Sequence, residues 1–333
     1  MMKRILFGIT LLALLLCACG ENVSIEPQEG RIIAGQDVRV EEITFRSGKF
    51  KVVGDLLMPA EGDRLPAVIL VHGDGPATRR TGSSIGHTTR IFLQNGYAVF
   101  SWDKPGSGES TGQINNALTQ RAEILADGIA VLAEYPNIDP GRIGLWGISQ
   151  AGWVMPLALD LRDDVAFMIV VSGGAEDSIE QAAYIVSQEV LSDGGTEEEA
   201  ALVERYWSQQ NKATEYDEYH EAMEVLMGIP QVQSRYDMVI TEENRWKPVS
   251  RDFDLFIDPM GIIEHTTIPV LAIFGEWDKI VDPVQGAEAY EAALHAAGNQ
   301  DYQIEVLPRA PHNLENMPEY RKLLEGWLQH LSK

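Results

Sequence analysis

A serine enclosed by small residues is the first feature of this sequence that could do chemistry. Ser149 lies within the stretch Gly-Ile-Ser-Gln-Ala at 147–151, which follows an apolar run at 142–146 and precedes a helical pattern at 152–161. A strand that turns sharply into a helix needs small residues at the turn, and it presents the serine hydroxyl above the edge of a sheet. Such a hydroxyl acts as a nucleophile when a base is near. The alternative interpretation is a serine that only caps the helix.

Two later loops supply a candidate base and a candidate acid for Ser149. His312 lies between the last strand-like run and the last helical pattern, and Asp278 follows the preceding strand-like run. A histidine that takes a serine proton needs a carboxylate to fix its tautomer, so the three residues together can carry out acyl transfer. Two other carboxylates stay open as the acid, because Asp177 follows an earlier strand-like run and Asp282 lies in the same loop as Asp278. We favour Asp278 over both.

The elements that must position these loops alternate between strands and helices. Strand-like runs occur at residues 38–46, 50–58, 66–71, 97–102, 142–146, 165–171, 268–274 and 302–307. Helical spacing of apolar residues occurs at residues 88–95, 118–134, 152–161, 284–297 and 320–331. The first two runs predict a hairpin, and the later alternation predicts an α/β protein with a mostly parallel sheet covered on both faces. The carboxyl ends of parallel strands share one edge, where Ser149, Asp278 and His312 would meet.

Five short motifs, in this order, resemble those of the α/β-hydrolase superfamily. They are His-Gly-Asp-Gly-Pro at 72–76, Asp-x-x-Gly-x-Gly-x-Ser at 103–110, the serine turn at 147–151, Gly-x-x-Asp-x-x-Val at 275–281 and Ala-Pro-His-Asn at 310–313. The serine turn has alanine in place of the second glycine, and alanine is still small. The turn and the hairpin are most similar to the dienelactone-hydrolase, acyl-hydrolase and serine-peptidase-like branches. The resemblance implies a doubly wound sheet with an N-terminal hairpin and a helical lid insertion.

The resemblance also implies a role for each member of the serine site. Ser149 attacks a carbonyl, and His312 acts first as general base and then as general acid. Asp278 orients His312 and stabilises its imidazolium. Asp103 and Ser110, in the second motif, are expected only to stabilise a turn through bonds from side chain to backbone.

An oxyanion hole is expected beside the serine. Its donors would be the backbone N–H groups of Gln150 and of Asp74 or its neighbour in the loop after Gly73. Gly73 and Gly75 would let the backbone of the supporting loop approach closely. His72 is expected to brace this loop rather than to serve as a second base.

Residues 176–265 interrupt the alternation with a helical stretch that would cover the serine as a lid. Its aromatic residues would either line an apolar substrate pocket or pack the lid onto the sheet, and the sequence leaves both open. They are Tyr184, Tyr206, Trp207, Tyr216, Tyr219 and Trp246. Its acidic residues would either hold the amine of a peptide substrate or form a solvated helix face. They include Glu197, Glu198, Glu199 and Glu204.

The N-terminus carries the pattern of a secretory signal. Lys3 and Arg4 precede an uncharged apolar run at 5–16, which is short for a membrane span. The run ends at Cys19 preceded by Ala18, which resembles a bacterial lipobox in which the cysteine is lipidated. An ordinary cleaved signal is the alternative. No cysteine follows Cys19, so the exported protein would have no disulfide.

These patterns divide the chain into segments and exclude some partners. The predicted segments are a signal peptide at 1–18, a tether at 19–36, an α/β-hydrolase core at 37–175 and 266–333, and the lid at 176–265. The chain has 333 residues and a net charge of −24, which repels nucleic acids. Its histidines lack the spacing of metal ligands, so neither a metal nor another cofactor is expected.

The sequence as a whole predicts an exported serine hydrolase held at a bacterial membrane by a lipid anchor. The expected substrates are small carboxylic esters with short acyl chains, cleaved through an acyl-enzyme. A serine peptidase or aminopeptidase that acts on small peptides is the first alternative. A binding lipoprotein without catalytic activity is the second. The physiological substrate and the oligomeric state stay open.

Overall fold

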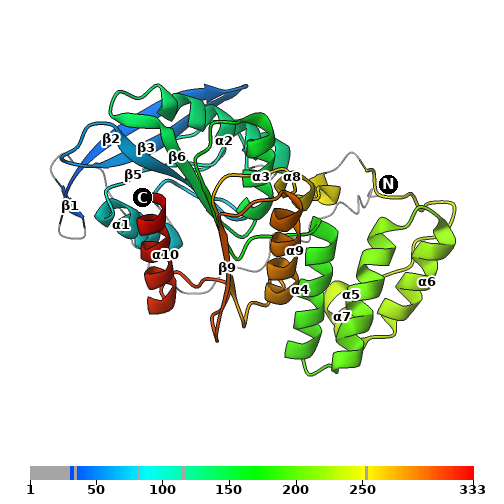
Figure 1. The fold of residues 1–333 in the computed structure, drawn as a ribbon. Coiled ribbons are helices and arrows are strands. Elements are labelled where there is room, and N and C mark those ends of the chain that lie inside the picture. The colour runs from blue at the N-terminus through cyan, green and yellow to red at the C-terminus, as the bar shows by residue number, and fades with distance from the viewer. Residues whose placement is uncertain (1–30, 34–35, 81–82, 115–116, 252–253) are drawn as a thin grey trace.

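The computed structural model describes residues 31–33, 36–80, 83–114, 117–251 and 254–333 (Figure 1). The predicted signal peptide, Cys19 and most of the tether lie outside the described residues. Within the described part of the chain, the strands form one nine-stranded sheet in the order β1-β2-β3-β5-β4-β6-β7-β8-β9. The strands are β1 Arg31–Ile33, β2 Gln36–Ser47, β3 Phe50–Pro59, β4 Leu65–Val71, β5 Ala98–Trp102, β6 Ile138–Ile148, β7 Met168–Val171, β8 Val270–Gly275 and β9 Tyr302–Leu307.

The sheet is parallel from β5 to β9 and antiparallel at its N-terminal edge, as the sequence predicts. The hairpin of β2 and β3 turns between the paired residues Ser47 and Phe50, where Gly48 has a φ of +51°. Such a φ favours glycine. The short strand β1 pairs with β2 and falls within the predicted tether. β6 begins earlier than its apolar run because Ile138 pairs with Leu65 of β4.

Helices cover both faces of the sheet, and each face has its own buried apolar cluster. Neighbouring residues of β4 illustrate this, because Ile69 belongs to one cluster and Leu70 to the other, both with 0% exposure. A strand covered on both faces must be apolar throughout. Figure 1 shows α1 and α10 on one side of the sheet and α2, α3 and α9 on the other. These helices are α1 Ser83–Gln94, α2 Leu118–Ala133, α3 Ala151–Leu161, α9 Pro283–Ala296 and α10 Pro318–Leu331.

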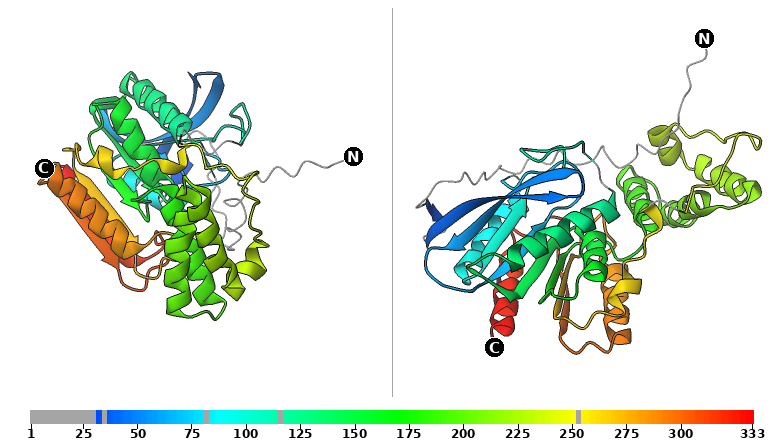
Figure 2. Two further views of the ribbon diagram at one scale, coloured as in Figure 1. Left: turned by 90° about the vertical axis from the view of Figure 1, so that its right-hand side faces the viewer. Right: turned by 90° about the horizontal axis from the view of Figure 1, so that it is seen from above.

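The helices between β7 and β8 form a separate packed group that projects from the sheet (Figure 2). They are α4 Ser178–Ser192, α5 Glu197–Lys212, α6 Tyr216–Met227 and α7 Pro230–Tyr236, followed by η1 Asp254–Phe256 and α8 Met260–Ile263. Apolar residues of α4 to α7 bury against one another in a cluster that contains Trp207. A second cluster contains Tyr219, with Trp246 packed against it. Among the helices described, none combines the length and the apolar character needed to cross a membrane.

Candidate active site

The turn between β6 and α3 holds Ser149 in a strained conformation. Its φ is +58°, a left-handed value that costs a non-glycine residue about 1–3 kcal/mol. Backbone bonds on both sides fix this turn: the Ser149 N–H donates to Val171 O at 3.0 Å, and the Gly152 N–H donates to Ser149 O at 2.8 Å. The N-cap of α3 is Gln150, so the alternative of a capping serine is wrong.

Close contacts explain why the residues around Ser149 are small. A Cβ atom added to Gly147 would lie 2.5 Å from the Cβ of Ala151. One added to Gly152 would lie 2.5 Å from the backbone nitrogen of Gly174. Alanine therefore fits at 151 because Gly147 faces it, and the glycine that the helix needs is one residue later, where α3 meets the end of β7.

His312 and Asp278 form a buried hydrogen-bonded pair at the same edge of the sheet. The distance between His312 Nδ1 and Asp278 Oδ2 is 2.8 Å, and the Asp278 side chain is fully buried. Asp278 Oδ1 accepts the backbone N–H groups of Ile280 and Val281 at 2.8 and 3.0 Å. When Nδ1–H donates to this carboxylate, Nε2 is the nitrogen that accepts a proton, as a general base requires.

Two further residues hydrogen-bond to the backbone of this pair: Ser172, which the sequence analysis did not name, and Tyr184, which it named only as an aromatic residue of the lid. Ser172, at the end of β7, donates its hydroxyl to His312 O at 3.0 Å. Tyr184 of α4 donates its hydroxyl to Asp278 O at 2.8 Å. The only sequence signal for Ser172 is a polar residue directly after a buried strand. No local pattern marks Tyr184 as a contact of the acid loop.

The two alternative carboxylates cap helices instead. Asp177 accepts backbone N–H groups at the start of α4, and it also pairs with Lys212 at 2.7 Å. Asp282 accepts backbone N–H groups at the start of α9. Of the three candidates, Asp278 is therefore the one whose carboxylate meets His312.

The loop after β4 lies beside the serine because β4 and β6 are neighbours, with Val71 paired to Gly147. A Cβ atom added to Gly73 would lie 3.2 Å from the Cβ of Ser149 and 3.7 Å from its Oγ. Gly75 has a φ of +77°, which favours glycine. The expected oxyanion loop is thus in contact with the candidate nucleophile.

His72 braces this loop, as predicted. Its Nε2 lies 3.2 Å from Thr78 O. Burial, together with the nearby charges of Lys104 and Arg121, lowers the pKa of His72 to about 3. The ring is therefore neutral at physiological pH, and its Nε2–H can donate to Thr78 O.

Asp103 and Ser110 stabilise the loop after β5, also as predicted. Asp103 accepts the backbone N–H groups of Arg79 and Glu109, each at 2.8 Å. Ser110 Oγ accepts the backbone N–H of Val53 at 2.9 Å. The buried guanidinium of Arg79 also reaches Asp103, at 2.5 Å, and links this loop to the loop after β4.

Two of the acidic residues named in the helical region, Glu199 and Glu204, have structural partners. Thr196 and Glu199 form a capping box at the start of α5, and Glu204 accepts the Ser187 hydroxyl at 2.7 Å. Glu176, between β7 and α4, is half-buried, and burial with the nearby charges of Glu180, Asp282 and Asp177 raises its pKa to about 7. Among the described residues, no group of three or more metal-ligating side chains is present.

The solved structures that share this fold include several esterases. The esterase Pf2001 of Pyrococcus furiosus superposes with a TM-score of 0.60 at 16% identity and covers 93% of this chain and 98% of its own. Est1E of Butyrivibrio proteoclasticus, solved with ferulic acid bound, has a TM-score of 0.55 at 15% identity and covers 87% and 97%. These identities establish the fold alone, which is that of the α/β-hydrolases.

Sequence comparisons match parts of the chain. The family model described as X-Pro dipeptidyl-peptidase (S15 family) matches residues 48–308. A thiohydrolase, aneE of Aspergillus aculeatus, is 32% identical over 121 residues, which is 34% of this chain and 36% of the relative. The polyketide transferase claH of Penicillium crustosum is 28% identical over 134 residues, which is 40% and 41%. The chain thus spans less than half the length of these curated relatives.

Proposed function

The chain belongs to the S15 family of X-Pro dipeptidyl-peptidases, and from this premise we propose that it is a serine hydrolase that cleaves small carboxylic esters through an acyl-enzyme. The observation that carries the proposal is the buried bond between His312 and Asp278, at the sheet edge where Ser149 is held in a strained turn. This arrangement prepares a base whose proton-accepting nitrogen is Nε2.

The reaction proposed for these groups proceeds in two halves. Ser149 Oγ attacks the carbonyl carbon while its proton passes to His312 Nε2, and the N–H groups of Gln150 and Asp74 bind the oxyanion. The tetrahedral intermediate expels the alcohol, which takes the proton from His312. Water then attacks the acyl-enzyme with the same base, and free Ser149 and a carboxylic acid result.

A peptidase acting on small peptides is the second candidate, favoured by the description of the family itself. The same groups serve both reactions, since an amine leaving group also takes its proton from His312. An ester bond is easier to cleave than an amide bond, because an alkoxide leaves more easily than an amine anion. An ester substrate therefore detects the proposed chemistry whichever bond is cleaved in the cell.

Parallel assays with p-nitrophenyl acetate and with aminoacyl and X-Pro p-nitroanilides test the proposal. We expect turnover of the ester, and we expect none for Ser149→Ala. Turnover of the anilides alone would replace the esterase by the peptidase. A wild-type protein that turns over neither, and does not react with a fluorophosphonate, would favour a binding lipoprotein.

We also propose that the protein is exported and lipid-anchored through Cys19, on the basis of the sequence pattern at 1–19. Expression of the full chain in a bacterium, followed by detergent phase partition, tests this. The wild type should enter the detergent phase and Cys19→Ala should not. Equal behaviour of the two proteins would indicate an ordinary signal or none.

A further inference from the structure

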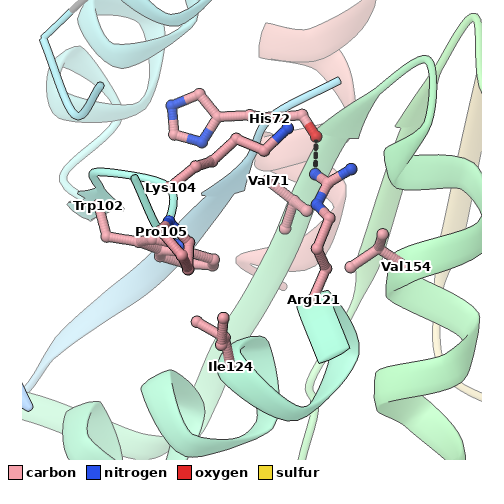
Figure 3. A pocket seen from close by; sticks show the side chains of 8 residues that line it. All are labelled: Val71, His72, Trp102, Lys104, Pro105, Arg121, Ile124 and Val154. Atoms are coloured by element: carbon pink, nitrogen blue, oxygen red, sulfur yellow. Dashed lines mark hydrogen bonds between the residues drawn. The ribbon is translucent and has the colours of Figure 1, made fainter. Parts of the chain in front are cut away.

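Two cationic side chains are buried behind the loop at residues 72–76. Lys104, which follows β5, is 4% exposed, and Arg121, in the first turn of α2, is 6% exposed. Figure 3 shows the two side chains reaching His72 from different elements. Both side chains and His72 line a cavity of about 10 Å³. That volume is about the space of one water, so the groups around it are closely packed.

Both cations donate hydrogen bonds to the main chain of this loop. Lys104 Nζ donates to Gly73 O at 3.0 Å and to Gly75 O at 2.6 Å. Arg121 donates to His72 O, the contact marked in Figure 3. Side-chain N–H groups of two basic residues therefore hold the carbonyls of three residues in the loop.

The direction of these carbonyls fixes the direction of the N–H groups. In a trans peptide the C=O and N–H of one unit point to opposite sides. The described chain contains no cis bond, so the Asp74 N–H points away from Lys104 when Gly73 O points toward it. Because Gly73 contacts Ser149, the orientation of this peptide decides whether the Asp74 N–H serves as a donor there.

Arg121 also connects this loop to the other side of the site. It donates to the side-chain oxygen of Gln150, the residue that directly follows Ser149. One guanidinium thus joins the carbonyl of His72 to the residue that would supply the second oxyanion donor. A guanidinium suits this position because it presents several donors in a fixed plane, whereas an ammonium is a single point.

The burial of two like charges so close together opposes their ionisation. Burial and the charge of Arg121 lower the pKa of Lys104 to about 6, and burial lowers the pKa of Arg121 to about 10. Asp74 opposes both shifts. Two buried basic side chains are an unfavourable way to fill space compared with apolar ones, which points to a role beyond packing.

We propose that Lys104 and Arg121 are positioning residues that build the oxyanion hole. Lys104 turns the peptide between Gly73 and Asp74 so that its N–H faces the nucleophile. Arg121 sets the distance between that donor and the donor at Gln150. The proposal rests on the proposed function, because a hole is needed only if Ser149 forms a tetrahedral intermediate.

The test compares Lys104→Met and Arg121→Lys with wild type on p-nitrophenyl acetate, with a boronic acid as a transition-state analogue. Loss of one oxyanion donor typically lowers kcat by about 10²–10³-fold. We expect a fall in kcat with KM unchanged, and a loss of boronic-acid affinity by the same factor as the loss in kcat. A smaller folded fraction would lower the apparent kcat but leave the inhibition constant unchanged.

Arg162→Met is the control, because Arg162 is a half-buried basic residue at the opposite end of α3 from Ser149, where it pairs with Asp164. Its kcat should match wild type. Arg121→Lys keeps a cation in place. If Lys104→Met does not fold, the kcat of Arg121→Lys alone tests the proposal. Wild-type kcat in folded Arg121→Lys and Lys104→Met would overturn the proposal while the esterase stands. An inactive wild type would instead overturn the proposed function.

Discussion

Replacement of Asp278 by asparagine is the substitution that most sharply tests how the site is assembled. The carboxylate of Asp278 is fully buried and has three contacts, with His312 Nδ1 at 2.8 Å and with two backbone N–H groups. Asparagine has the same size and keeps an oxygen for the two backbone donors, so the loop should keep its shape. It then turns its NH₂ group toward His312.

That change reverses the tautomer of the base. A ring that must accept at Nδ1 carries its proton at Nε2, and it cannot take the proton of Ser149. The wrong tautomer lowers kcat by about 10⁴-fold, which raises the activation free energy by about 5.4 kcal/mol at 1.36 kcal/mol per factor of ten. The assay is kcat/KM for p-nitrophenyl acetate, with the melting temperature as a check on folding.

Asp177→Asn and Asp282→Asn are matched controls for this experiment. Both residues cap helices, and asparagine caps as well as aspartate, so both variants should fold and keep most of their activity. If Asp278→Asn retained more than a tenth of the wild-type rate, or Asp177→Asn lost as much as Asp278→Asn, the assignment of the acid would be refuted.

Three further outcomes follow from the contacts described. Gly73→Ala should lose activity but keep its melting temperature, because the added Cβ lies 3.2 Å from Ser149 Cβ and displaces the loop; an unchanged kcat would contradict this. Thr196→Ala removes the capping box of α5 and should lower stability by about 0.5–2 kcal/mol in thermal melts, with kcat unaffected. Glu176→Gln should raise the melting temperature relative to wild type at pH 8 but not at pH 4.5. Because the pKa of Glu176 is raised to about 7, folding takes up a proton between pH 4.5 and 7, and the stability of the wild type falls as the pH rises through that range. If Glu176→Gln and wild type differed in melting temperature by the same amount at both pH values, the raised pKa would be excluded.

The strands and helices of the sheet were predictable because each is fixed by local pattern. The hairpin and β9 agree with their runs closely, and the sheet edge that collects Ser149, Asp278 and His312 follows from strand order. β6 was predicted too short, because the exposed Pro140 and Gly141 separate its buried first residue, Ile138, from the apolar run, and Ile138 pairs with Leu65 of β4.

The residues that hold the site from behind were harder to predict, since their roles depend on contacts between distant segments. Tyr184 and Asp278 are 94 residues apart, and nothing near either residue in sequence indicates their bond. Arg121 did carry a signal: it lies on the apolar stripe of α2, between Leu118 and Leu125, where a buried cation needs a partner.

The aromatic residues of the helical region were named from the sequence, but their role was left open. The sequence left open whether they line a pocket or pack the lid onto the sheet, and the structure shows neither for several of them, which pack the helices of this region against one another. Trp207 packs among α4 to α7, and Trp246 stacks on Tyr219 with ring centroids 5.6 Å apart. Tyr184 is the one placed against the acid loop.

Covalent labelling with a fluorophosphonate, followed by peptide mass spectrometry, tests the central claim most directly. We predict one adduct, on the peptide that contains Ser149, formed in step with the loss of ester hydrolysis and absent from Ser149→Ala. An adduct on a different residue, or a Ser149→Ala protein that still turns over the ester, would contradict it.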